Sequence, residues 1–300
     1  MTINYRQARQ ADLSPAQDLI TASINELTVR HGFGAIASAR PPVFQAQSLA
    51  DDPAGFWIAE QDGRLVGSTF SWVCGDLWFL AELFVDPALQ GKGVGGELLR
   101  RVFAQADAAG AKTRALITFA FNTVSQSLYM REGMFPRLPL HMMTGERATL
   151  AAALTPTALR SERIESVDAD RDGLTRLDLG ALGVSREKHR RMLARDPSLS
   201  GYLFFRDSDC VGYAWIADSG HVGPLAAAAR EDMRDVFAAA LALAAQGASK
   251  RVSALVPGAC ETALALATRC GMRIALPMAL ASNRDFGDWR RYLPRNPLFM

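Results

Sequence analysis

The layout of the first half of this chain recurs in the second half, and this repetition constrains the fold more than any other feature. Gly55–Trp72 holds two strand-like runs around an Asp-Gly turn, which is a strong hairpin signal. Gly201–Gly212 parallels Gly55–Gly67 with one residue fewer. In each half a helical stripe, a strand-like run and a second helical segment ending before Gly-Met follow. Two tandem copies of one fold are expected.

The elements of the first copy predict a mixed α/β fold, with a hairpin-built sheet that carries helices. Its centre is a strand, a glycine-rich turn, a helix and a second strand, with the strands at Leu77–Val85 and Ala115–Phe121. A length of 300 residues suits two domains. The Ala/Thr/Pro-rich segment near residues 148–161 suits a linker, which predicts domains at 1–147 and 162–300.

Composition excludes several classes of function. The formal net charge is +2 and no long basic run occurs, so neither nucleic acid nor a membrane surface is an expected partner. The charged stretch Ser185–Arg191 is expected to be a solvated helix face. The four cysteines are scattered, without the spacing of a zinc site or a disulfide scaffold. With no secretory signal and no apolar run of bilayer length, a cytoplasmic protein is expected.

Four glycines at a helix start mark a place where backbone comes close to a ligand, often a phosphate. They lie in V-D-P-A-L-Q-G-K-G-V-G-G-E-L-L, Val85–Leu99. Gly91, Gly93 and Gly96 match the spacing of a dinucleotide-binding loop. That loop follows the first strand of its unit and needs a later acidic residue, and neither condition is met here. A P-loop requires Ser or Thr after its lysine, whereas Gly93 follows Lys92. A turn that only permits tight packing is the remaining alternative.

Gln90, Gly93 and Gly95 resemble the signature of the GCN5-related N-acetyltransferase (GNAT) family, in which this loop binds the pyrophosphate of acetyl-CoA. A second match follows at the expected distance, in Asn122, Ser125 and Tyr129, shortly before Gly133–Met134. The resemblance covers roughly residues 3–147. It implies two tandem GNAT-like domains, each a mostly antiparallel twisted sheet flanked by helices.

The resemblance also implies roles for individual residues. Tyr129 would protonate the departing CoA thiolate or donate a hydrogen bond to its sulfur, and main-chain groups of the strand before the loop would bind the thioester arm. Glu82 interrupts an otherwise apolar strand, so it is the candidate base, although a solvent-facing carboxylate is the alternative. Tyr129 could likewise be a core tyrosine. The expected cofactor-binding residues are Leu83, Phe84, Val85, Gln90, Gly91, Lys92, Gly93, Val94, Gly95, Gly96, Asn122 and Ser125.

The second half keeps the pattern of apolar residues but lacks the polar residues and glycines of the two motifs in the first half. H-V-G-P at His221–Pro224 is aligned with F-V-D-P of the first half, and Glu231 and Asp232 then place carboxylates at a helix N-terminus. Cys260 and Ala267 stand opposite Asn122 and Tyr129. This pattern resembles the degenerate C-terminal domain of tandem bacterial members of the family.

The expected function is that of an enzyme, an acetyl-CoA-dependent N-acetyltransferase. It would transfer an acetyl group to a small-molecule amine by direct attack in a ternary complex, with no metal, as a monomer or homodimer. The alternative is a regulatory or sensor protein that binds CoA or acyl-CoA with little catalysis.

Overall fold

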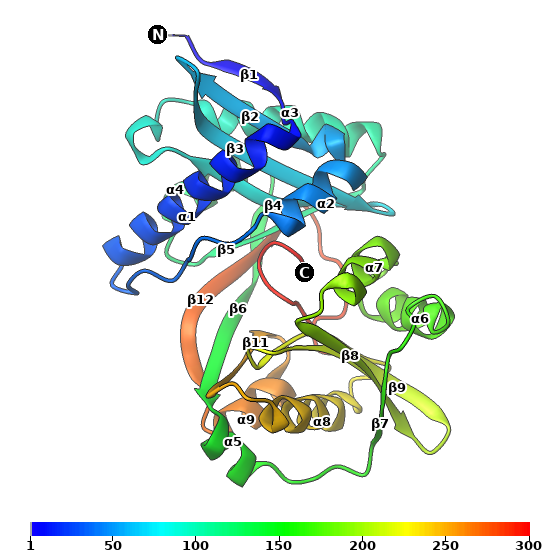
Figure 1. The fold of residues 1–300 in the computed structure, drawn as a ribbon. Coiled ribbons are helices and arrows are strands. Elements are labelled where there is room, and N and C mark those ends of the chain that lie inside the picture. The colour runs from blue at the N-terminus through cyan, green and yellow to red at the C-terminus, as the bar shows by residue number, and fades with distance from the viewer. Residues whose placement is uncertain (1) are drawn as a thin grey trace. The chain divides into compact units, whose positions relative to one another are not determined.

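The computed structural model describes residues 2–300, which group by their contacts into two compact units (Figure 1). The first unit comprises the chain up to Phe135 together with Ala281–Arg284. The second comprises Pro136–Leu280 together with Asp285–Met300. Within the first unit, Asn283 accepts the backbone N–H of Arg114 at 2.9 Å and donates from Nδ2 to the carbonyl of Lys112 at 3.1 Å. A short segment from late in the sequence thus belongs to the first unit.

The first unit has a mixed sheet whose strands follow one another in chain order. They are β1 (Asn4–Gln7), β2 (Phe56–Gln61), β3 (Arg64–Cys74), β4 (Leu77–Val85) and β5 (Thr113–Phe119). Neighbours from β1 to β4 are antiparallel, whereas β4 and β5 are parallel. The predicted hairpin of β2 and β3 is formed, and Asp62 takes the positive φ of its turn at 52°.

Helices cover both faces of this sheet, with α1 and α2 on the near face in Figure 1. The helices of the unit are α1 (Leu13–Arg30), α2 (Val43–Asp51), α3 (Val94–Ala108) and α4 (Thr123–Arg131), with short 3₁₀ turns η1 (Gln10–Asp12), η2 (Pro53–Gly55) and η3 (Pro87–Leu89). The apolar stripe of α3 repeats at helical spacing and is buried against β2, β3 and β4. This packing fixes the start of α3 directly beyond the end of β4.

The second unit repeats this arrangement and has additional strands. Its sheet order is β12-β6-β11-β10-β9-β8-β7, and β13 also pairs with β10. The strands are β6 (Phe135–Glu146), β7 (Arg160–Arg163), β8 (Leu199–Arg206), β9 (Asp209–Ala217), β10 (His221–Ala227), β11 (Arg251–Pro257), β12 (Arg273–Ser282) and β13 (Tyr292–Leu293). The helices are α5 (Arg147–Ala153), α6 (Arg171–Leu182), α7 (Glu187–Arg195), α8 (Met233–Gln246) and α9 (Glu261–Arg269).

Corresponding turns and caps relate the two units. Asp207 turns the hairpin of β8 and β9 with a φ of 53°, as Asp62 does in the first unit. Gly133 and Gly271 follow α4 and α9 with the same φ of 78°. Both units also carry a parallel pair at the centre, β4 with β5 and β10 with β11. The predicted mixed α/β fold in two tandem copies is confirmed.

The expectation that Ser185–Arg191 is a solvated helix face is wrong. Arg186, His189 and Arg190 are buried, and a carboxylate and carbonyl groups make their burial possible. Arg190 forms an ion pair with the buried Asp178. Arg186 donates to the carbonyl of Phe299 and to the hydroxyl of Tyr292. Arg186 and Arg190 of this run therefore lie in the interior of the second unit, whereas Arg191 is exposed.

Candidate functional site

β4 and β5 separate at the middle of the first sheet. Their parallel register runs from Leu77↔Thr113 to Leu80↔Leu116 and stops there, although both strands continue. At the same point a bulge in β4 shifts its pairing with β3 between Leu80 and Glu82. The remaining part of β4, Leu83–Val85, therefore has a main-chain edge that β5 does not cover. Such an edge can pair with an extended ligand.

A glycine-rich loop joins this open strand end to α3. Gly91 and Gly93 have φ values of 76° and 85°, in the left-handed region that favours glycine. The first helical hydrogen bond runs from the N–H of Glu97 to the carbonyl of Gly93, so the N–H groups of Val94, Gly95 and Gly96 have no acceptor within the helix. Together with the helix dipole, these N–H groups favour an anion at this place.

Room for a ligand is present beside the loop. A Cβ built on Gly91 or Gly93 would meet no atom within 4 Å, and one on Gly95 would meet only the side chains of Leu128 and Val85, at 3.7 Å. Substitution of Gly95 by a small residue is thus compatible with the folded protein itself. The absence of a side chain here leaves space in front of the helix N-terminus for a group other than protein.

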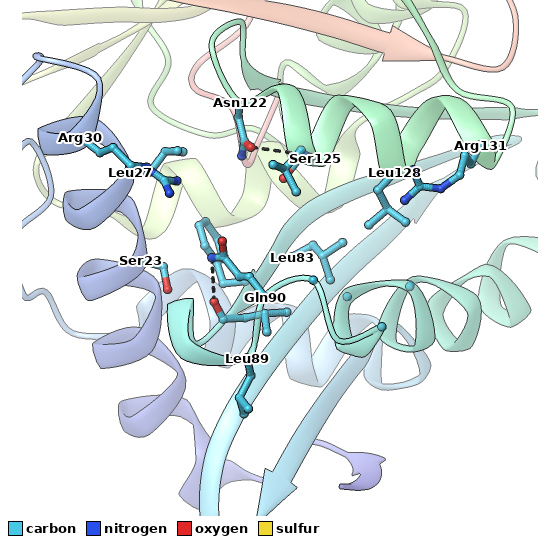
Figure 2. A pocket seen from close by; sticks show the side chains of 17 residues that line it. Ser23, Leu27, Arg30, Leu83, Leu89, Gln90, Asn122, Ser125, Leu128 and Arg131 are labelled. Carbon is cyan, nitrogen blue, oxygen red and sulfur yellow. Dashed lines mark hydrogen bonds between the residues drawn. The ribbon is translucent and has the colours of Figure 1, made fainter.

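A pocket of about 330 Å³ opens over the loop and the exposed edge of β4 (Figure 2). Asn122 caps α4 by accepting the N–H of Ser125 at its Oδ1, at 3.2 Å, and Nε2 of Gln90 donates to the carbonyl of Val85 at 3.2 Å. Ten of the twelve expected cofactor-binding residues line this pocket: Leu83, Phe84, Val85, Gln90, Gly91, Gly93, Gly95, Gly96, Asn122 and Ser125.

The other two expected residues lie elsewhere. Lys92 is exposed and is not part of the pocket wall. The side chain of Val94 is 1% exposed and packs in the core with Val66 and Leu98, so only its backbone can face a ligand. Of the expected pair of catalytic residues, neither Glu82 nor Tyr129 lines the pocket.

The pocket wall includes residues that the sequence did not single out. Arg30 and Arg131 bring two guanidinium groups to it, which suits an anionic ligand. Arg30 approaches Glu26 at 3.6 Å, one turn away on the same helix. The helical spacing of the wall residues could have indicated them, because one face of each helix supplies them. They are Ser23, Leu27 and Arg30 on α1, and Leu128 and Arg131 on the face of α4 that also carries Ser125, with Leu89 and Val124 beside them.

Tyr129 lies in the hydrophobic core behind the pocket wall. Its ring packs in the cluster that contains Trp78, Leu99 and Met134. Burial raises the pKa of its hydroxyl well above the usual range, although a hydrogen bond with the side chain of Ser125 opposes that shift. The phenol therefore keeps its proton at neutral pH, and its partner Ser125 belongs to the pocket wall.

Glu82 is a buried carboxyl group beside the bulge of β4, with an exposed fraction of 2%. Its Oε1 accepts a hydrogen bond from Nε2 of Gln45 at 2.8 Å. Its Oε2 is buried and has no hydrogen-bond partner in the part of the chain that the structure describes. Burial raises the pKa of Glu82 to about 7, and the bond from Gln45 opposes this rise. The group can thus exchange a proton near neutral pH.

In the second unit, the chain itself covers the corresponding strand edge. The parallel register of β10 and β11 ends at Val222↔Ala254, and β13 then pairs with β10 at Leu225↔Leu293 and Ala226↔Tyr292. Because β9 occupies the other edge of β10 at these residues, β13 lies on the edge that is open in β4. The side chains of Tyr292 and Leu293 are fully buried.

The start of α8 also differs from that of α3. Asp232 is its N-cap residue, and its carboxylate forms an ion pair with Arg206. At α9 the N-cap is Cys260, whose Sγ donates to the carbonyl of Arg290 at 3.2 Å, and Ala267 is fully buried. A carboxylate paired with Arg206 and a buried cysteine thus stand where the first unit has Gly93 and Asn122.

The predicted alignment of Pro224 with Pro87 does not match the structure. Pro224 lies inside β10, where that strand is bulged, whereas Pro87 begins the turn η3 after β4 has ended. The bulges and helix caps give the structural correspondence instead. They place Asp232 opposite Gly93 and Leu225 opposite Glu82. The first unit alone has a carboxyl group at this point of the strand.

Among residues 2–300, no group of three or more His, Cys, Asp or Glu side chains is arranged to hold a metal ion. No helix within the same range combines the length and the apolar character needed to cross a bilayer.

Comparison with known proteins agrees with this geometry. Residues 22–134 match the sequence model of the acetyltransferase (GNAT) family. Mycothiol acetyltransferase from Cellulomonas flavigena is 35% identical in an alignment of 108 residues. The alignment covers 31% of this chain and 30% of that enzyme. The chain thus aligns with less than a third of that relative.

Solved structures show the same fold along almost the whole chain. A protein from Pyrococcus horikoshii, named as a candidate acetyltransferase, has a TM-score of 0.77 at 15% identity and covers 99% of this chain and 96% of that one. A tandem GNAT protein from the clavulanic acid biosynthesis pathway has a TM-score of 0.62 at 13% identity and covers 94% and 98%. At these identities the likeness extends to the fold alone.

Proposed function

Because this chain belongs to the acetyltransferase (GNAT) superfamily through residues 22–134, we propose that its first unit is an acetyl-CoA-dependent N-acetyltransferase. The observation that carries the proposal is the pocket in which a glycine-rich helix N-terminus meets the open edge of β4. The acceptor is the amine of a small molecule, and the naming of one relative as a mycothiol acetyltransferase supports a small-molecule acceptor.

The residues of the pocket suit CoA in three respects. The free N–H groups of Val94, Gly95 and Gly96 would hold the diphosphate at the positive end of α3. The open edge of Leu83–Val85 would bind the amide groups of the pantetheine arm through main-chain hydrogen bonds, with Asn122 and Ser125 across the pocket. Arg30 and Arg131 would add positive charge for the phosphates.

Transfer forms a bond between the amine nitrogen and the acetyl carbon, and it breaks the bond from that carbon to the CoA sulfur. The amine must lose a proton, and Glu82 would accept it because its pKa near 7 leaves it partly ionised at neutral pH. The departing thiolate needs a proton, and Tyr129 would supply it. Holding both reactants in one complex would contribute further to the rate.

The second unit has no acyl-CoA site in this proposal. The pairing of β13 with β10 covers the strand edge that the arm would need, and the carboxylate of Asp232 at the start of α8 disfavours an anion such as the diphosphate. The chain therefore has a single catalytic domain at its N-terminal side, followed by a degenerate domain of the same fold.

The test is an assay of thiol release from acetyl-CoA by the full chain, with a panel of small amines and mass spectrometry of the products. The proposal expects release that depends on at least one amine, with a matching acetylated product. Glu82→Gln should lose most of this activity. Saturable CoA binding without turnover on any amine would instead indicate a sensor that binds the nucleotide.

A further inference from the structure

Gln45 of α2 links Glu82 to the helical layer above the sheet. The side chain is buried, with an exposed fraction of 4%. Its Nε2 donates to Oε1 of Glu82 at 2.8 Å and to Oε1 of Gln17, on α1, at 3.0 Å. An amide nitrogen carries two hydrogens, so both are used in these bonds. The two acceptors thus fix the orientation of the amide and the face that it presents to Glu82.

We propose that Gln45 is a positioning residue for Glu82, holding the carboxylate by Oε1 so that Oε2 remains the oxygen that takes the proton of the attacking amine. This inference rests on the proposed function, since it assigns a task to the base of that reaction. The contrast between the two carboxylate oxygens supports this inference. Oε1 accepts a hydrogen bond from the anchored amide of Gln45, whereas Oε2 is buried without a hydrogen-bond partner in the described residues.

The surroundings of Glu82 make this single bond important. The elements packed around it supply neutral groups: Gln45 from α2, Gln17 beyond it on α1, and Thr69 of β3, whose hydroxyl donates to the backbone carbonyl of Glu82 at 2.9 Å. No charged group contributes to the pKa of this carboxyl; burial and the bond from Gln45 are its causes. In a buried site, a hydrogen bond to a carboxylate is stronger than one in water.

Removing the amide should therefore affect both protonation and orientation. Gln45→Met keeps the length of the side chain but cannot donate, so the charged form of Glu82 loses the hydrogen bond that stabilises it. We expect the acidic limb of the pH profile of kcat/KM to move upward by about one pH unit, which is tenfold in activity at pH 6. The affinity for CoA should stay unchanged, because Gln45 is not part of the pocket wall.

A matched control is available on the same helix. The side chain of Gln47 is only partly buried and makes no hydrogen bond within the described residues, so Gln47→Met should leave the profile unchanged. If Gln45→Met fails to fold, Gln45→Asn serves instead, since it keeps the amide but is too short to reach Glu82. An independent readout is the ¹³C NMR titration of the Glu82 carboxyl, identified by its loss in Glu82→Gln.

The outcomes separate the two proposals. An upward shift in both the NMR titration and the pH profile supports the positioning role. If Glu82→Gln is inactive but the Gln45 variants titrate and react like the wild type, the positioning role is overturned while the base remains. If Glu82→Gln retains full activity, the role of Glu82 in the proposed function fails, and with it this inference.

Discussion

Gly93 and Asp232 occupy the same position in the two units, the N-cap of the helix that follows the bulged strand. Gly93 has a φ of 85° and no side chain, so the N–H groups behind it stay free. Asp232 instead places a carboxylate at the positive end of α8, where it is paired with Arg206. The two helix starts thus differ in residue type and in backbone conformation, because Gly93 is in the left-handed region and Asp232 in the right-handed helical region.

Gly95→Ala should separate folding from ligand binding. The new methyl group meets protein atoms only at ordinary contact distance, and alanine favours a helix over glycine by up to about 1 kcal/mol. We expect unchanged or higher thermal stability but weaker binding of CoA, because the methyl group projects toward the diphosphate position. Calorimetric titration with CoA measures the loss.

Gly173→Ala is the control for this substitution. Gly173 lies in α6 of the second unit, where a Cβ would meet no atom within 4 Å. It should raise stability in the same way and leave CoA affinity at the wild-type value. Equal affinities for all three proteins would argue against a diphosphate at the start of α3.

Tyr129→Phe should lower kcat with little effect on the binding of CoA. The substitution removes the proton donor and the hydrogen bond to Ser125 but keeps the ring in its core position. General acid catalysis contributes on the order of 10²–10⁴-fold in rate, so a loss in that range is expected. The measurement is steady-state kinetics with acetyl-CoA and the best amine of the panel.

The control for this change is Tyr202→Phe, in β8 of the second unit, which should have normal kinetics. An unchanged kcat in Tyr129→Phe would remove Tyr129 from the mechanism and leave it as a core residue. A large loss of thermal stability would show that the hydroxyl matters chiefly for folding.

Glu82 should make the stability of the protein depend on pH. Its pKa is raised from 4.5 to about 7 in the folded state, so the folded state holds this proton more tightly than the unfolded state. The free energy of unfolding therefore falls as pH rises from about 4.5 to 7, by about 3 kcal/mol in total, and this contribution is then constant. Glu82→Gln removes the effect.

Urea denaturation at pH 4.5 and pH 8 measures this difference. The stability of Glu82→Gln relative to the wild type should increase between the two pH values, whereas Glu165→Gln, at an exposed loop position, should show no such increase. A constant difference between Glu82→Gln and the wild type would mean that the carboxyl is not buried in solution as it is here.

Local patterns predicted the elements whose signals are contained in a few neighbouring residues. The hairpin at Asp62-Gly63, the start of α3 behind the glycines and the end of α4 before Gly133 are of this kind. The nine-residue helix α2 was missed, because it follows a loop rich in Pro, Ala and Ser and has a weak apolar stripe. The residue Gln45 was consequently missed with it.

Contacts between distant residues could not be inferred from spacing. Gln45 and Glu82 are brought together by the packing of α2 on the sheet, and the burial of Arg186 depends on the carbonyl of Phe299 far along the chain. The strand β13 has only two residues, too few for any periodicity. Tertiary structure places such residues. They include Tyr292 and Leu293 of β13, which cover the edge of β10 in the second unit.

Titration of the full chain with CoA by isothermal calorimetry tests the central claim most directly, with Gly93→Asp as the variant that gives the first unit the cap of the second. The account predicts saturable binding of one CoA per chain, and loss of that binding in Gly93→Asp while its fold is retained. Two CoA molecules per chain, or equal binding by Gly93→Asp, would contradict it.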